Sequence, residues 1–129
     1  MSPKQPDLVV ALAGNPNSGK TTIFNELTGA KQHTGNWPGV TVEKKEGVFH
    51  FKGKTVKVVD LPGTYSLSSY TIDERIARDY LINNRPDIVV VISDASNLER
   101  HLLLFLQMRE LGLPVVLVLN MMILQKQGE

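Results

Sequence analysis

Gly14-Asn15-Pro16-Asn17-Ser18-Gly19-Lys20-Thr21 fits the pattern G-x-x-x-x-G-K-[ST], and no other part of the chain constrains the fold as strongly. It lies between an apolar run that predicts a buried strand, Leu8 to Ala13, and a predicted helix, Lys20 to Thr28. The pattern is typical of a loop whose backbone N–H groups surround a phosphate, because glycines permit the tight turn and the helix start adds its positive dipole end. We expect Lys20 to neutralise phosphate oxygens and Thr21 to bind Mg²⁺. A glycine-rich turn with an incidental lysine is the weaker alternative.

The rest of the chain alternates between predicted strands and helices. Further strands are expected at Val42–Phe51, Thr55–Asp60, Ile88–Ser93 and Val115–Leu119. Further helices are expected after two capping-box patterns, Thr71 with Glu74 and Ser96 with Glu99, and should end near Arg85 and Gly112. This order predicts an α/β fold with a mostly parallel sheet, one antiparallel hairpin strand and helices on both faces.

The segment Ala30 to Gly39 predicts a long loop, since it contains two glycines, a proline and no regular period. Trp37 within it is expected to be exposed and mobile. The run Leu102 to Leu106 is expected to face inward from its helix onto the sheet.

Length and composition favour one soluble intracellular domain. The chain has 129 residues, of which 42% are hydrophobic, and it lacks both cysteine and any apolar run near the roughly 20 residues needed to cross a bilayer. No secretory signal is expected at the N-terminus. Fourteen Lys and Arg are balanced by thirteen Asp and Glu, which argues against nucleic acid as a partner.

Two further segments favour a switch GTPase over a general nucleotide binder. Asp60-Leu61-Pro62-Gly63 follows a predicted strand, where the Asp60 carboxylate can hold Mg²⁺ through water and the Gly63 N–H can meet a γ-phosphate. Thr41, in the loop before the predicted hairpin, can supply a second hydroxyl to Mg²⁺. Each signal is weak alone, and their order along the chain gives them weight.

With these motifs in place, the chain resembles the N-terminal G domain of the FeoB ferrous-iron transporters. The resemblance runs from about Leu8 to Met122 and rests on Gly14 to Thr22, Gly35-Asn36-Trp37-Pro38-Gly39-Val40-Thr41-Val42-Glu43 and Asp60 to Leu67. It implies a Ras-like P-loop NTPase fold that binds GTP and GDP. It also implies a prokaryotic protein in which a cytosolic GTPase domain and a helical regulatory domain precede a membrane-embedded Fe²⁺ permease domain.

The resemblance also implies roles for single positions. Gly14 to Thr22 would surround the phosphates, while Thr41 in switch I, about 30–41, and Asp60 with Gly63 in switch II, about 61–71, would sense the γ-phosphate. Asn15 would help bind K⁺, with backbone carbonyls near Gly35 and Trp37 as the remaining ligands. Thr64 stands where many relatives have a water-orienting glutamine, so slow hydrolysis would depend on K⁺, Mg²⁺, Lys20 and backbone donors.

One departure concerns the guanine site. The family pattern Asn-x-x-Asp corresponds here to Asn120-Met121-Met122-Ile123, and isoleucine cannot accept the hydrogen bonds of guanine. Losing charge-assisted hydrogen bonds of roughly 1.5 to 3 kcal/mol each predicts weaker and less selective binding. The family's last strand and helix are also missing, so a single incomplete domain over residues 1–129 is expected, with an exposed sheet edge and a tendency to form homo-oligomers.

Two alternatives stay open beside the GTPase interpretation. The first is a truncated nucleotide-binding or regulatory module with little or no hydrolysis, and the second is a P-loop enzyme that uses ATP. The three histidines, His33, His50 and His101, share no metal-ligand spacing and are interpreted as isolated surface or half-buried residues.

Overall fold

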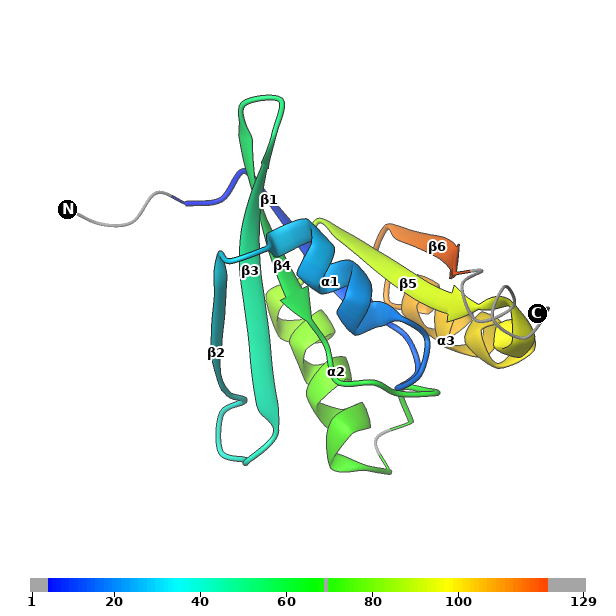
Figure 1. Ribbon diagram of the computed structural model, residues 1–129. Helices are drawn as coiled ribbons and strands as arrows, with labels where there is room; N and C mark the ends of the chain where they lie inside the picture. The colour runs from blue at the N-terminus through cyan, green and yellow to red at the C-terminus, as the bar shows by residue number, and fades with distance from the viewer. Residues whose placement is uncertain (1–4, 69, 121–129) are drawn as a thin grey trace.

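The computed structural model describes residues 5–68 and 70–120, which form a six-stranded sheet with helices packed against it (Figure 1). In chain order the elements are β1 (Leu8–Ala13), α1 (Lys20–Thr28), β2 (Gln32–Asn36), β3 (Glu43–Phe51), β4 (Lys54–Asp60), α2 (Ile72–Asn84), β5 (Ile88–Asp94), a 3-10 turn (Ala95–Asn97), α3 (Leu98–Glu110) and β6 (Val115–Asn120). The strand order is β2-β3-β4-β1-β5-β6. Neighbours among β4, β1, β5 and β6 are parallel, whereas β2 and β3 pair in an antiparallel manner.

Two apolar clusters, one on each face of the sheet, position the helices. Leu12 of β1 packs in one cluster with Phe24 of α1, while its neighbours Ala11 and Ala13 belong to the other cluster. That second cluster contains Leu81 of α2 together with Leu104 and Met108 of α3, from the helices that lie behind the sheet in Figure 1. The prediction of a strand buried on both faces, with helices on both sides of the sheet, is confirmed.

Strand β2 corrects the prediction of a continuous loop from Ala30 to Gly39. Gln32–Asn36 pairs in an antiparallel manner with Glu43–Gly47 of β3, which also pairs in an antiparallel manner with β4, so the sheet has one edge strand more than predicted while β3 stays its one reversed strand. The side chains of β2 are mostly exposed, and its pairing is made by backbone groups. An edge strand of this kind leaves no apolar alternation in the sequence, which is why the pattern did not indicate it.

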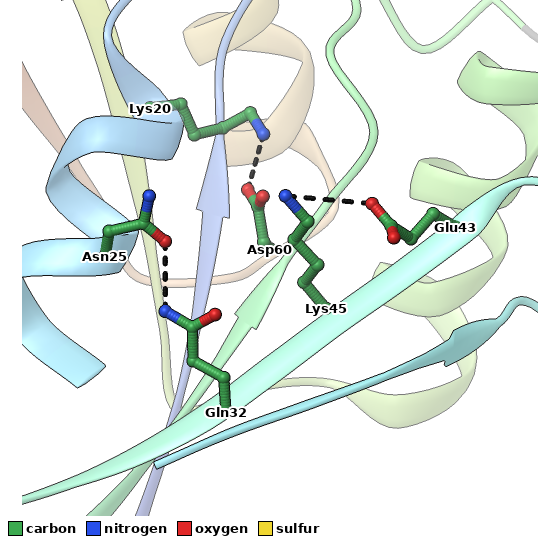
Figure 2. A network of polar contacts seen from close by, with 6 residues as sticks. All are labelled: Lys20, Asn25, Gln32, Glu43, Lys45 and Asp60. Carbon is green, nitrogen blue, oxygen red and sulfur yellow. Dashed lines mark hydrogen bonds and ion pairs between the residues drawn. The ribbon is translucent and has the colours of Figure 1, made fainter. Parts of the chain in front are cut away.

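Side chains also attach β2 to helix α1. The Gln32 amide Nε2 donates to Asn25 Oδ1 at 2.9 Å (Figure 2). It also donates to Thr28 Oγ1 at 3.0 Å. The backbone N–H of Lys31 donates to the Thr28 carbonyl at 3.0 Å. The segment after α1 is therefore fixed to the end of that helix before it enters the sheet.

Of the two predicted capping boxes, the structure confirms one. At α2 the Thr71 hydroxyl accepts from the Glu74 N–H at 3.1 Å, and the Glu74 carboxylate accepts from the Thr71 N–H at 3.0 Å, which completes the predicted capping box. The second predicted capping box is wrong. Ser96 lies in the 3-10 turn and donates to Asp94 Oδ1 at 2.6 Å, and α3 begins only at Leu98.

Helix α3 and strand β6 expose several large apolar side chains, some of which were predicted to face inward. Leu104 is buried, but the inward face expected for the whole run from Leu102 to Leu106 is wrong, because a helix turns neighbouring residues to different sides. The exposed large apolar residues of these two elements are Leu98, Leu102, Leu103, Leu106, Val116, Val118 and Leu119. Within the described residues, no helix combines the length and apolar character needed to span a membrane.

Candidate functional site

Most of the predicted site residues lie at the carboxyl ends of the parallel strands. The loop of residues 14–19 follows β1, Asp60 is the last residue of β4, and Asn120 is the last residue of β6. Sheets of this class bind ligands in the crevice at the carboxyl ends of their strands. The fold therefore places the glycine-rich loop where this architecture binds ligands.

The loop packs so closely on its surroundings that two of its positions favour glycine. Gly14 has φ 149°, and a Cβ atom there would lie 2.4 Å from the carbonyl oxygen of Ile92. Gly19 has φ 90°, and a Cβ atom there would lie 1.9 Å from the amide nitrogen of Asn120. At Gly14 the backbone angle and the contact with a backbone oxygen both exclude a side chain, and at Gly19 the backbone angle disfavours one. The glycines of the motif are thus favoured by the folded loop itself.

Switch II and strand β6 each hold the loop by a hydrogen bond. The Thr64 N–H donates to the Gly14 carbonyl at 2.9 Å, and the Asn120 amide Nδ2 donates to the Ser18 carbonyl at 3.1 Å. Gly63 also lies close to the loop, since a Cβ atom on it would be 2.8 Å from Cα of Pro16. The structure thus brings Gly63 and Asn120 to the loop.

Helix α3 supplies a third contact, which the sequence interpretation missed. His101 is 2% exposed, and its Nε2 accepts from the Asn15 N–H at 3.3 Å. The expectation of surface or half-buried histidines agrees with exposed His33 and His50 but is wrong for His101. Its place on the buried face of α3, three residues before Leu104, is the sequence signal available for its burial.

Lys20 and Asp60 form a buried ion pair beside the loop (Figure 2). The two residues are 7% and 9% exposed, and the Lys20 ammonium donates to Asp60 Oδ1. Thr21 and Thr22, in the first turn of α1, are exposed. The site therefore pairs a cation suited to phosphate oxygens with a carboxylate suited to Mg²⁺, and an exposed threonine, Thr21, follows Lys20 directly in the chain.

Two buried polar atoms of the loop have no hydrogen-bond partner among the described residues. They are Asn15 Oδ1, on a residue that is 2% exposed, and Ser18 Oγ, on a residue that is fully buried. Buried polar atoms are normally satisfied, so unpartnered ones in a loop of this type indicate a place for a ligand. The residues present therefore fit a phosphate group with its metal ion. Asn17, in contrast, is exposed at the tip of the loop.

The predicted switch I residues lie apart from the loop. Thr41 is exposed in the turn between β2 and β3, and Figure 1 shows that turn well separated from the segment joining β1 to α1. Gly35 lies in β2.

Trp37 is 5% exposed, which corrects the prediction of an exposed tryptophan. The centroids of the Trp37 and Tyr80 rings are 5.7 Å apart. The Lys44 ammonium lies over the Trp37 ring, 4.8 Å from its centroid.

Switch II is attached to α2 through Glu74. The Ser66 hydroxyl donates to Glu74 Oε2 at 2.5 Å and the Ser68 hydroxyl to the same atom at 3.1 Å. The hydrogen bond from Ser66, with smaller contributions from Thr71 and Ser68, lowers the pKa of Glu74 against the opposing effect of its partial desolvation. The sequence indicated Glu74 only as a helix cap, and its bonds to the two serines were not predicted.

Part of the predicted guanine site lies outside the described residues. Met121, Met122 and Ile123 belong to this part. Asn120, the first residue of the motif, is described, and its side chain contacts the phosphate loop as given above.

Comparisons with known proteins agree with this geometry. A family model described as ferrous iron transport protein B matches residues 8–129. The Fe(2+) transporter FeoB of Methanocaldococcus jannaschii is 64% identical over 103 residues, which cover 80% of this chain and 15% of that protein. The Fe(2+) transporter FeoB of Escherichia coli K12 is 54% identical over 126 residues, covering 94% of this chain and 16% of that protein.

Solved structures give the same result. The crystal structure of the G domain of T. maritima FeoB is 52% identical, with a TM-score of 0.87, and the match covers 93% of this chain and 76% of that one. A GDP-bound variant of S. thermophilus NFeoB is 50% identical with a TM-score of 0.85, covering 95% of this chain and 47% of that one. The chain thus spans most of a G domain and 15–16% of the curated relatives.

The buried ion pair predicts the effect of removing one of its charges. Lys20→Met should lower the unfolding free energy of the nucleotide-free protein by about 3 kcal/mol, because Asp60 would stay buried without its cation. The double variant Lys20→Met with Asp60→Leu should recover most of this loss. Urea denaturation measures both. Lys57→Met serves as the control, since the pair of Lys57 with Glu46 is half exposed, and it should cost less than about 1 kcal/mol. An unchanged midpoint for Lys20→Met would contradict the buried pair.

Glu74 predicts a stability difference that depends on pH. Glu74→Gln should destabilise the protein by about 1 kcal/mol or less at neutral pH, since the carboxylate is partly exposed. The folded protein lowers the pKa of Glu74, so its contribution is present above the ordinary glutamate pKa and is lost as the pH falls through the lowered value. Thermal unfolding of both proteins from neutral to acid pH should show the difference disappearing. Glu26→Gln, on the exposed side of α1, is the control. A difference that persists at acid pH would contradict this role.

Proposed function

The chain belongs to the family of ferrous iron transport protein B, and from this premise we propose that it binds GTP and GDP with Mg²⁺ and slowly hydrolyses GTP. Its fold is that of the family's G domain, a P-loop NTPase fold. The observation that carries the proposal is the Lys20–Asp60 pair beside a loop that disfavours side chains at Gly14 and Gly19.

The ion pair suggests how the site receives a nucleotide. An incoming phosphate gives the Lys20 ammonium a stronger anionic partner than a single carboxylate, and Asp60 is then free to hold the metal through water. Bound Mg²⁺ supplies neutralisation of the charge that develops on the phosphate oxygens. Thr21, at the start of α1, is the exposed hydroxyl placed to ligate it, with Thr41 as the second hydroxyl from switch I.

Hydrolysis in this site depends on charge stabilisation, because Thr64 has no group that orients water as a glutamine amide does. The Lys20 ammonium and the backbone N–H groups of the loop stabilise the charge that grows on the phosphoryl oxygens. Gly63, which lies against Pro16, is placed to direct its N–H at the terminal phosphate. A site that lacks the glutamine is expected to turn over slowly.

The K⁺ proposal concerns two asparagines in the same loop. Asn15 carries a buried Oδ1 atom without a protein partner, which supports the proposed role as a ligand. Asn17 is exposed on the same loop and offers a second amide oxygen. The carbonyls of Gly35 and Trp37 complete the proposed set, although in this structure the Trp37 carbonyl accepts from the Val40 N–H at 3.2 Å. Both asparagines therefore belong in the test.

The biological role proposed for the domain is to regulate Fe²⁺ uptake at the cytoplasmic face of the prokaryotic inner membrane. The relatives that carry this role are much longer proteins, described as Fe(2+) transporters, of which this chain spans 15–16%. The proposed partners are the helical regulatory domain and the membrane permease domain of such a protein. A homo-oligomer is also proposed, because β6 is an edge strand with exposed Val116 and Val118.

A second candidate function is a nucleotide-binding module with weak or no hydrolysis and reduced guanine selectivity. The specific observation that favours it is Ile123, where the guanine motif has aspartate. The intact Lys20, Thr21 and Asp60 favour the active GTPase. ATP as the substrate is disfavoured by the family match.

One calorimetric comparison tests nucleotide binding and its selectivity. The unmodified chain should bind Mg-GDP more tightly than Mg-ADP but by a small factor, because Ile123 cannot accept from the guanine ring. Ile123→Asp should raise the affinity for Mg-GDP about tenfold or more and leave Mg-ADP unchanged. Lys20→Met is the control for binding through the loop. Strong guanine selectivity in the unmodified chain would refute the role given to Ile123, and no binding of either nucleotide would refute the proposed function.

GTP turnover in K⁺ and Na⁺ tests the cation proposal. Turnover should be faster in K⁺ than in Na⁺ at equal ionic strength, because the larger cation would occupy a site completed by an amide oxygen. Asn15→Ala should abolish the difference if its Oδ1 is the ligand, and Asn17→Ala should abolish it if the exposed amide is the ligand. Phosphate release over time is the measurement. Equal rates in both salts for the unmodified chain would discard the K⁺ site.

A further inference from the structure

We propose that His101 of α3 is a positioning residue for the phosphate-binding loop, a role that rests on the nucleotide binding proposed above. The histidine and its partner Asn15 are each 2% exposed. The Asn15 N–H donates to His101 Nε2 at 3.3 Å, and the two residues are 86 positions apart in the chain. The contact therefore joins the start of the loop to helix α3, which packs against β5 and β6.

The chemistry of the contact assigns the two ring nitrogens. A backbone N–H group can only donate, so Nε2 must present its lone pair to it. The ring then carries its proton on Nδ1. This is a specific tautomer, and it makes Nε2 the acceptor that the loop requires at this point.

A second hydrogen bond, to the carbonyl of the same peptide group, supports this role of the contact. The Gly14 carbonyl and the Asn15 N–H belong to one peptide unit. The carbonyl accepts from the Thr64 N–H at 2.9 Å, while the N–H donates to His101. Rotation of this peptide would break both bonds, so switch II and α3 together fix its orientation.

A hydrogen bond across the loop connects this peptide to the residues that follow it. The Asn15 carbonyl accepts from the Ser18 N–H at 3.3 Å, which closes the turn across the loop. The backbone of Gly14 packs against the Ile92 carbonyl, which restricts its movement toward β5. A loop whose first peptide is fixed in this way is preorganised for its ligand, and preorganisation lowers the cost of binding.

The acceptor atom of His101 distinguishes it from the apolar residues beside it on α3. The neighbours of His101 on the buried face of α3 are Leu104 and Met108, and an apolar residue would fill the same space. It would also leave the Asn15 N–H buried without an acceptor. The imidazole of His101 thus presents to the loop an acceptor that an apolar side chain lacks.

Mg-GDP titrations of three variants test this role. His101→Leu should weaken binding about tenfold, mainly through faster GDP release, because the loop loses its anchor. His101→Gln should stay within about threefold of the unmodified protein, since its amide oxygen can replace Nε2 as the acceptor. Leu104→Ala, one turn along the same buried face, should lower the melting temperature but leave the affinity of the folded protein unchanged. If His101→Leu does not fold, His101→Met takes its place.

A second measurement uses the unmodified protein. ¹⁵N NMR of the imidazole should show a proton on Nδ1 and none on Nε2. A proton on Nε2 would overturn the contact, and equal GDP affinity of the Leu and unmodified proteins would overturn the positioning role. Equal losses in the Leu and Gln variants would also overturn it, because the effect would then follow from packing. Failure of the unmodified chain to bind GDP would refute the proposed function, while the NMR result would still decide the contact.

Discussion

The buried ion pair of Lys20 and Asp60 is the constraint around which the site is arranged. It joins the first residue of α1 to the last residue of β4, and neither charge is accessible enough to be solvated by water alone. Each residue therefore needs the other while the site holds no phosphate. The same two charges suit a nucleotide and its metal ion, so the pair keeps the site folded and available. In the proposed mechanism, ligand binding would exchange one set of charge partners for another, so that neither charge is left buried without a partner.

Around this pair, the loop receives one hydrogen bond from each of three separate parts of the chain. Thr64 of switch II holds the Gly14 carbonyl, His101 of α3 holds the Asn15 N–H, and Asn120 of β6 holds the Ser18 carbonyl. These parts also face other regions: switch II is attached to α2, and α3 exposes leucines on its outer side. The shape of the loop is thus coupled to segments that a neighbouring domain can reach.

The sequence predicted the fold and the central site because both depend on local patterns. Unbroken apolar runs indicated the parallel strands, and the spacing of Gly14, Gly19 and Lys20 indicated the loop. Strand β2 was missed because an exposed edge strand is held by its backbone and needs no apolar period. The contact of His101 was missed because it joins residues 86 positions apart, which no local pattern records. Trp37 was misplaced because its burial depends on Tyr80 and Lys44, which lie elsewhere in the chain.

The burial of Trp37 sets a requirement on any nucleotide that is to recruit switch I. Trp37 packs in the core cluster, so a movement of the turn with Thr41 toward the loop that withdraws Trp37 from this cluster loses the free energy of its burial. Burying about 150–250 Å² of aromatic surface at about 25 cal/mol per Å² contributes roughly 4–6 kcal/mol. The buried indole N–H of Trp37 has no hydrogen-bond partner among the described residues. Its desolvation costs about 1–3 kcal/mol, which reduces the net stabilisation from burying the ring. A ligand shifts such an equilibrium only by its differential affinity, so GTP must favour the recruited arrangement by at least this remainder. In the proposed mechanism, contacts of the γ-phosphate and its metal ion with Thr41 and Gly63 would be the interactions that GDP lacks and that supply this difference in affinity.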